Sequence, residues 1–179
     1  MRYYETFYGI HTDDWSWDFG TFTSHPKVLV KEYINEACST TNTSTATDTN
    51  EFLYPHHIKK EYFIEGVIEG HITVASSTAT STVTSYRVTV GKVNQETGKE
   101  TLYSTGWVTV DDSIEWNSTY SIGKENVYPF WIDAWEKERL TEYDRIFIRV
   151  EVNGDNNCVL WHSNDSTWED IKITIPLRL

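Results

Sequence analysis

The stretch that decides the fold class lies at the C-terminus and reads Ile171-Lys172-Ile173-Thr174-Ile175-Pro176-Leu177-Arg178. Every second residue in it is aliphatic, and the residues between are polar, charged or proline. Because side chains on an extended strand point alternately to its two faces, this pattern predicts a strand with one buried and one solvent-facing side. Proline has no N–H to donate to a neighbouring strand, so we expect Pro176 at the edge or rim of a sheet.

The same alternation extends over two longer stretches. Residues 144–152 are aliphatic at every second position, and the turn-forming residues 153–157 predict a hairpin with a returning strand at residues 158–162. Residues 62–74 alternate too, with Gly66 and Gly70 on the aliphatic face, which predicts a bend or bulge where another layer comes close. Further strands are expected at residues 27–36, 82–94, 100–110, 114–121 and 128–135.

About eight to nine antiparallel strands separated by short polar turns are typical of an all-β protein built as a single jelly roll or β-sandwich. We expect this domain at residues 22–179, preceded by an N-terminal arm of aromatic and acidic residues at 1–21. Helical spacing competes at residues 131–138, but a strand to Trp135 followed by a charged loop or a single helical turn is preferred. The predicted core consists of Ile64, Ile68, Ile72, Val88, Val90, Ile146, Ile148, Val150, Ile171, Ile173 and Ile175.

The composition narrows the range of partners. The chain has 179 residues with 15 Lys and Arg against 27 Asp and Glu, which gives a formal net charge of −12. A chain this acidic argues against a nucleic-acid partner, since phosphate backbones bind basic surfaces. The apolar runs are far shorter than the ~20 residues that span a bilayer, so no membrane association is expected. The first residues lack the basic start and apolar core of a signal peptide, so we expect synthesis and release in the cytoplasm if Met1 is the native start rather than the end of a trimmed chain.

The sequence has no motif that indicates catalysis or a cofactor. It contains neither a G-x-S-x-G nucleophile turn nor a glycine-rich phosphate-binding loop, so we expect no enzymatic activity, no cofactor and no metal site. Cys38 and Cys158 lack metal-ligand spacing, and two buried thiols are favoured over a disulfide between them. Calcium is a less favoured explanation than a docking arm for the acidic segment that holds Asp13, Asp14 and Asp18.

Aromatic residues gather on the faces opposite the predicted core. In residues 100–110 and 128–135 one face is aliphatic, whereas the other carries Tyr or Trp and needs a cover. Three covers are possible: a segment of the same chain, a protein interface, or a ligand whose sugar rings stack on the aromatics. The arm is too aromatic to stay solvated, so we expect it to pack on its own sheet or, preferably, on a neighbouring subunit. The interface candidates are Trp15, Trp17, Tyr103, Trp107, Trp131 and Trp135.

Three stretches carry a resemblance: IEGVIEGHITV at residues 64–74, LTEYDRIFIRVEV at residues 140–152 and LWHSNDST at residues 160–167. Over roughly the last two thirds of the chain, the sequence resembles jelly-roll accessory structural proteins of tailed viruses of bacteria and archaea. The resemblance implies a non-enzymatic virion protein, such as a capsid decoration, head or tail component, made in the host cytoplasm. It would assemble with other virion proteins or with copies of itself. No functional residue is transferred, because such modules share a scaffold and not a site.

The alternative function is a carbohydrate-binding β-sandwich module. In that case exposed aromatic side chains would stack on sugar rings, with Tyr103, Trp107, Trp131 and Trp135 as the candidates. The two functions predict different behaviour, because a glycan module binds sugars as a monomer whereas a virion protein is found on purified particles.

Overall fold

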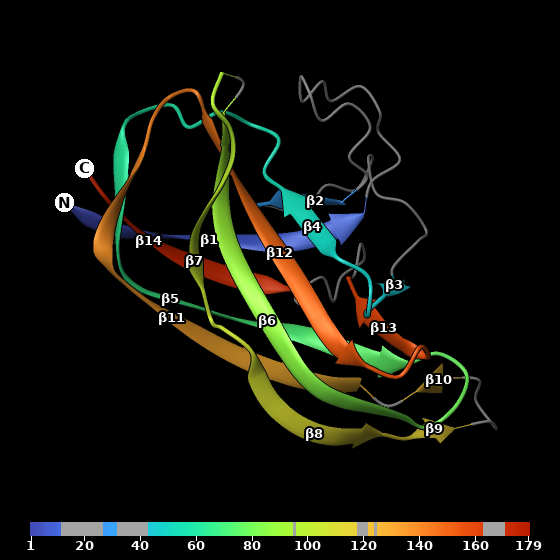
Figure 1. Cartoon of the computed structure of the whole chain (residues 1–179). Coiled ribbons are helices and arrows are strands. Elements are labelled where there is room, and N and C mark those ends of the chain that lie inside the picture. The colour runs from blue at the N-terminus through green and yellow to red at the C-terminus, as the bar shows by residue number, and fades with distance from the viewer. Residues whose placement is uncertain (12–26, 32–42, 95, 118–121, 124, 163–170) are drawn as a thin grey trace.

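The computed structural model describes residues 1–11, 27–31, 43–94, 96–117, 122–123, 125–162 and 171–179. Within these residues the chain is all-β and contains no helix, which confirms the fold class expected from the period-two pattern (Figure 1). The described strands number fourteen rather than about nine, since short strands form where the alternation is too brief to be recognised.

The strands follow one another along the chain as β1 (Arg2–His11), β2 (Lys27–Val30), β3 (Thr43–Thr45), β4 (Asn50–Leu53), β5 (Tyr62–Ser76), β6 (Ser81–Asn94), β7 (Gly98–Ser104), β8 (Val108–Ile114), β9 (Trp116–Asn117), β10 (Ile122–Gly123), β11 (Glu125–Leu140), β12 (Asp144–Gly154), β13 (Cys158–Trp161) and β14 (Lys172–Arg178).

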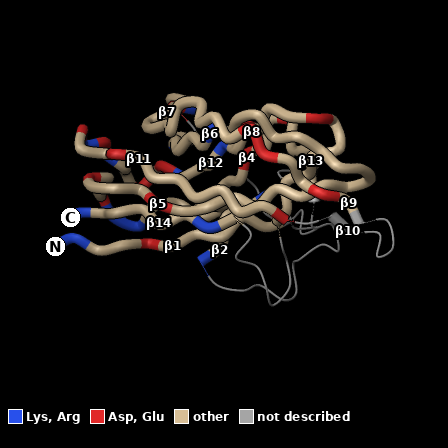
Figure 2. The backbone as a smooth tube through the Cα atoms, turned by 90° about the horizontal axis from the view of Figure 1, so that it is seen from below, with Lys and Arg blue, Asp and Glu red and all other residues tan. Residues whose placement is uncertain are grey.

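Twelve of these strands form one continuous hydrogen-bonded sheet that folds over into two layers (Figure 2). One layer runs β11–β5–β14–β1–β2, and β13 with its neighbour β3 pairs with the C-terminal end of β5. The other layer runs β4–β12–β6, and both β7 and β8 pair with β6. The layers are joined through β2 and β4, which lie parallel and pair at Val28 and Leu53. The result is a sandwich whose layers are continuous along one side, while β9 and β10 form a separate pair.

The core lies between the two layers and contains the residues that the alternation predicted. Each member of the predicted core set is at most 1% exposed. A smaller apolar cluster surrounds Phe147, which packs with Ile10 and Leu53. The period-two pattern therefore identified correctly which side of the long strands is buried.

The start of the chain belongs to the sheet, although we expected it in an arm. Strand β1 lies between β14 and β2 and pairs with both, and Phe7 on its inner side is 1% exposed. The inner side also carries Tyr3 and Glu5 in place of aliphatic residues, so the strand shows little hydrophobic alternation. The strand forms nevertheless, because its backbone is hydrogen-bonded to β14 on one edge and to β2 on the other. Residues 12–21 of the expected arm lie outside the described residues.

The expected hairpin after β12 does not form. Strand β13 crosses to the other layer, where it pairs with β5 and β3. The turn between β12 and β13 is held by a side chain: the carboxylate of Asp155 accepts a hydrogen bond from the backbone N–H of Thr82 at 2.8 Å. Turn-forming residues mark a reversal of the chain, but they do not specify which strand the next segment pairs with.

Pro176 lies in the middle of the sheet, between β1 and β5, and the expectation of an edge position is wrong. The pairing of β14 with β5 is interrupted between Thr174 and Leu177, so a missing N–H is tolerated there. Gly66 lies at this interruption with a φ of 137°, and a Cβ on it would meet the ring of Pro176 at 3.2 Å. The irregularity that the sequence predicted at Gly66 is thus confirmed.

Several strand boundaries differ from the expected ones, including that of the strand expected at residues 114–121, because Ile114 is the last residue of β8 and β9 begins at Trp116. Strand β11 continues past Trp135 to Leu140, with a register shift between Ala134 and Glu138, and no loop or helical turn forms there. The expected strand at residues 100–110 is interrupted after Ser104, where Gly106 takes a φ of 66°. A positive φ ends regular pairing, which separates β7 from β8.

Candidate functional site

Three of the predicted surface tryptophans are exposed. Trp131 and Trp135 lie on β11 with 69% and 61% of their surface exposed, and Trp107 before β8 is 46% exposed. The guanidinium of Arg87 lies 4.6 Å from the ring centre of Trp107, so one face of that indole is covered. Trp131 and Trp135 are therefore the most accessible of the described candidates.

Tyr103 does not lie on the surface with them. It is 9% exposed, and its hydroxyl donates a hydrogen bond to the backbone carbonyl of Glu136 on β11. The pairing of β7 with β6 shifts register between Val90 and Gly91, which turns Tyr103 toward the core. A shift of one residue exchanges the two faces of a strand, and it cannot be recognised from alternation alone. Trp15 and Trp17 lie outside the described residues.

Trp131 stands at one end of a platform built by four strands. The pairing of β11, β5, β14 and β1 aligns residues into two rows across the sheet. The first row is Trp131, Glu69, Thr174 and Thr6, and the second is Pro129, His71, Lys172 and Tyr8. We refer to these residues as the outer platform.

The outer platform faces away from the core because of the strand alternation. Side chains between its members, such as Phe7, Phe130 and Ile173, are buried between the layers. The long strands thus use one side to form the core, and the other side lies at the surface.

A hollow of about 330 Å³ opens beside Trp131. Its walls include Glu69, His71, Lys172 and Thr174 from the outer platform. Acceptor, donor and aromatic groups therefore converge on one concave surface, as they do in ligand sites.

Gly70 explains why the strands approach closely beneath this hollow. A Cβ at Gly70 would overlap the backbone carbonyl oxygen of Lys172 and lie 2.8 Å from the ring of Phe130. The predicted close approach at this glycine is confirmed, although the neighbours are adjacent strands of the same layer.

The polar groups of the outer platform suit a ligand with many hydroxyls. A carboxylate such as that of Glu69 accepts hydrogen bonds, the ammonium of Lys172 donates them, and a threonine hydroxyl does both. The hydroxyls of Thr6 and Thr174 lie 3.0 Å apart, and the ammonium of Lys172 lies 5.8 Å from the ring centre of Tyr8. Together with the indole of Trp131, these groups can hold a ring by stacking and by directed hydrogen bonds.

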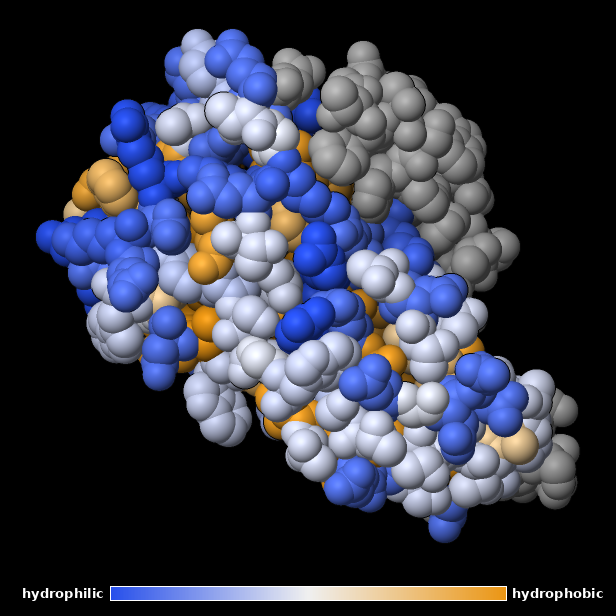
Figure 3. All heavy atoms as spheres, viewed as in Figure 1, coloured by the Kyte–Doolittle hydropathy of each residue, from blue (hydrophilic) through white to orange (hydrophobic). Residues whose placement is uncertain are grey.

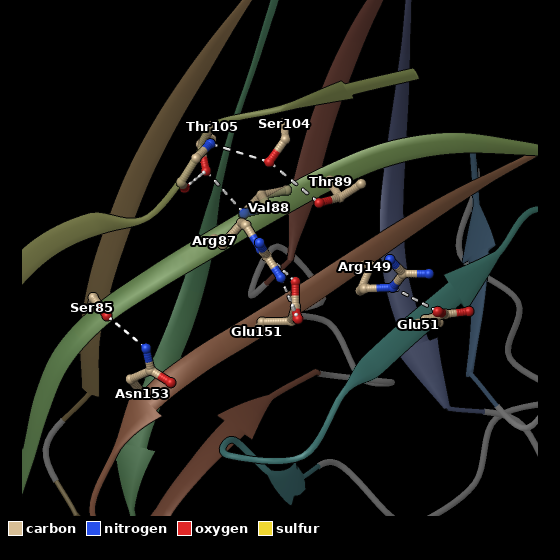
Figure 4. A network of polar contacts seen from close by, with 11 residues as sticks. Glu51, Ser85, Arg87, Val88, Thr89, Ser104, Thr105, Arg149, Glu151 and Asn153 are labelled. Atoms are coloured by element: carbon tan, nitrogen blue, oxygen red, sulfur yellow. Dashed lines mark hydrogen bonds and ion pairs between the residues drawn. The ribbon is translucent and has the colours of Figure 1, made fainter. Parts of the chain in front are cut away.

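The outer side of the second layer is occupied by the protein's own ion pairs (Figure 4). Arg87 on β6 donates to both carboxylate oxygens of Glu151 on β12, at 2.7 and 2.8 Å. Arg149 donates to the carboxylate of Glu51 on β4 at 2.7 Å. On the face shown in Figure 3, hydrophobic residues reach the surface only in small separate patches. The ion-paired side thus offers fewer groups to a ligand than the outer platform.

Metal and thiol chemistry receive no support from the described part of the chain. Among the described residues, no three His, Cys, Asp or Glu side chains lie close enough together to hold a metal ion. A separate finding is that the described residues contain no helix long and apolar enough to cross a membrane. Cys158 is buried, and its burial raises the pKa of the thiol. Cys38 lies outside the described residues, as do Asp13, Asp14 and Asp18.

Comparison with known proteins identifies the fold but no family. No family model matches the sequence, and no curated protein matches it. A CocE/NonD family hydrolase from Staphylococcus aureus is similar in structure with a TM-score of 0.57 and 10% identity, over 99% of this chain and 37% of that one. An aminopeptidase from a marine sediment Thaumarchaeota archaeon is similar with a TM-score of 0.56 and 11% identity, over 98% and 37%. The chain spans little more than a third of the length of these hydrolases.

These similarities correct the expectation that the chain is not an enzyme. The two solved structures named above match it almost from end to end and are hydrolases, and this finding overturns that expectation. At 10% and 11% identity, the likeness shows the shared fold alone. The resemblance to viral jelly-roll proteins, the location in the virion and the expected protein partners stay predictions.

Proposed function

We propose that this chain is a carbohydrate-binding β-sandwich domain of a hydrolytic enzyme, and that it holds sugar rings on the outer platform. The observation that carries the proposal is the position of Trp131, which is 69% exposed and borders a hollow lined by polar side chains. An exposed indole among donors and acceptors is the arrangement that an apolar sugar face with hydroxyls at its rim requires.

The dimensions of the site support a small ring ligand or the end of an oligosaccharide. The hollow of about 330 Å³ falls within the 300–1,000 Å³ that are usual for ligand sites. Trp131 and Tyr8 lie at diagonally opposite corners of the outer platform, on strands that are three spacings or about 14 Å apart. A chain of sugar rings lying across the strands would reach both aromatic side chains.

The hydrolase setting is supported by the fold comparison. In each of the two similar hydrolases, the part that matches this chain makes up 37% of the length. The other residues of those hydrolases therefore lie outside the β-sandwich that this chain matches. A binding domain in such an enzyme increases the local concentration of its substrate.

Replacement of Trp131 tests the binding role directly. The purified chain is titrated by calorimetry with cellohexaose, xylohexaose, maltohexaose and chitohexaose. Trp131→Ala should weaken binding of the recognised hexasaccharide about ten-fold or more, because an anchoring tryptophan contributes roughly 2 kcal/mol. Trp135→Ala is the matched control, since Trp135 is 61% exposed on the same strand but does not line the hollow.

The control variant should change the dissociation constant by less than about two-fold. Equal losses in the two variants would contradict a site at Trp131, and a failure of all four hexasaccharides to bind would contradict the carbohydrate assignment.

The hydrolase setting needs a separate experiment. An antibody against the chain should precipitate activity toward 4-nitrophenyl acetate from the source cells. A precipitate no more active than one made with a non-specific antibody would contradict this part of the proposal and leave the binding measurements intact.

A further inference from the structure

A second cavity, of about 350 Å³, lies at one end of the sandwich. It is bounded by the inner side of β1 and by residues 54–59, which lead from β4 into β5. Tyr3, Glu5 and Phe7 of β1 line it, whereas Thr6 and Tyr8 of the same strand belong to the outer platform. The cavity and the outer platform are therefore on opposite sides of β1.

Aromatic rings form the walls of this cavity. Tyr3 and Tyr62 meet edge to face with ring centres 5.4 Å apart, and Phe7 and Tyr54 do so at 5.2 Å. All four rings line the cavity. Two edge-to-face pairs leave apolar ring faces and edges for a further ring to pack against.

The charge at the cavity is opposite in sign to that of the chain as a whole. Lys31, Lys59, His56 and His57 line it, and Glu5 is the sole carboxylate among the described lining residues. The carboxylate of Glu5 is already held by the ammonium of Lys31 at 2.7 Å. Lys59 is exposed and forms no ion pair with a described residue. In a chain with a net charge of −12, this local surplus of cations favours an anion.

The guanidinium of Arg145 adds to this positive potential, whereas the two histidines contribute hydrogen-bonding groups. Burial lowers the pKa of His56, and the nearby charges of Lys59, Arg145 and Lys31 lower it further. Arg145 lies 3.0 Å from Nε2 of His57 and donates to it, so the Nδ1–H of His57 donates to the carbonyl of Tyr143 at 3.3 Å. His57 is thus held in one orientation, and Arg145 brings a further positive charge to the cavity.

We propose that this cavity binds a small aryl carboxylate, with the ring between the aromatic walls and the carboxylate at Lys59 and His56. The ring packs against Tyr54 and Tyr62. The carboxylate receives a charge-assisted hydrogen bond from the ammonium of Lys59 and a further hydrogen bond from a ring N–H of His56. The proposal does not depend on the carbohydrate site, since it uses the other side of β1.

The experiment compares three probes that separate ring from charge. Phenylacetate carries both, phenylacetamide carries the ring without the charge, and acetate carries the charge without the ring. In ¹H–¹⁵N NMR titrations of the full chain, phenylacetate should shift the amides of residues 54–62 and bind about five-fold more tightly than either other probe.

Lys59→Gln should weaken phenylacetate binding about five-fold, whereas Lys60→Gln, an exposed neighbour outside the cavity lining, should leave it unchanged. Lys59 is exposed, so its replacement leaves the fold intact. The proposal is overturned if phenylacetate and phenylacetamide bind equally, if the two lysine variants behave alike, or if the shifted amides lie away from residues 54–62.

Discussion

Ile68 and Val67 are adjacent residues of β5 whose side chains point to opposite sides of the sheet. Ile68 is fully buried, whereas Val67 is 36% exposed. Ile68→Ala should lower the free energy of unfolding by about 2–5 kcal/mol, because it removes buried methyl groups and leaves a cavity. Val67→Ala, the matched control, should cost less than about 1 kcal/mol. Urea denaturation measures both, and equal costs would mean that the register of β5 is shifted by one residue.

Single residues were predictable from sequence where only local geometry mattered. Gly66 and Gly70 were correctly associated with an irregularity and a close approach, because a missing side chain on a buried face is itself a signal. Tyr103 was assigned to the wrong face, since its orientation depends on a register shift set by the pairing with β6. No residue in β7 is of a type that predicts this register shift.

Strand β11 pairs with β5 in its own layer and is also linked to the second layer by side-chain hydrogen bonds. Donors on β6 and β7 reach backbone carbonyl oxygens of β11: Tyr86 donates to Pro129 at 2.6 Å, Lys92 to Arg139 at 2.9 Å, and Tyr103 to Glu136. These hydrogen bonds connect the layers along the side where the sheet itself is not continuous. We expect them to hold β11, and with it Trp131, in place.

Tyr86→Phe tests this connection. The variant keeps the ring stacked on Tyr128, 5.4 Å away, and removes the hydrogen bond to Pro129. It should lower the free energy of unfolding by about 1 kcal/mol, the usual contribution of one such bond. Amide hydrogen exchange in β11 should become faster.

Tyr4→Phe serves as the control for the lost hydroxyl, because Tyr4 is 62% exposed and its hydroxyl can bond to water. Unchanged exchange in β11 of the Tyr86→Phe variant would show that the side-chain donors are dispensable for the position of the strand.

At the level of elements, the existence of the long strands was predictable and their partners were not. The segment at 158–161 was recognised as a strand, yet it pairs with β5 and β3 rather than with the preceding β12. A strand's alternation records which side is buried, whereas its partner is decided by hydrogen bonds to residues far away in the chain.

The stability of the whole molecule should depend on pH through its paired carboxylates. Burial alone would raise the pKa of Glu51, but hydrogen bonds and the charges of Lys99 and Arg149 outweigh it and lower the pKa. Since the folded-state pKa lies below the usual value of about 4.3, this stabilisation is present above that value and is lost as the pH falls through the folded-state pKa. Glu65 contributes in the same direction, because Arg178 holds its pKa low.

Glu51→Gln should therefore cost about 1 kcal/mol at pH 7, and this cost should shrink as the pH falls through the folded-state pKa of Glu51 and the native carboxylate becomes protonated. Urea midpoints between pH 7 and pH 3 measure the difference. Asp133→Asn, at an exposed position of β11, controls for the change in net charge. A constant difference between the Glu51→Gln variant and the wild type across this range would contradict the ion-pair account.

The alternation of residues was enough to predict the all-β class and the inner and outer sides of the long strands, because alternation is a local property of extended backbone. It also singled out Trp131 as an exposed aromatic residue. Only the tertiary structure placed Trp131 in one row with Glu69 and Thr174, since residues from three distant segments become neighbours through strand register. Register is set by many non-local contacts at once, so the outer platform and the cavity beside β1 exist only in the folded chain.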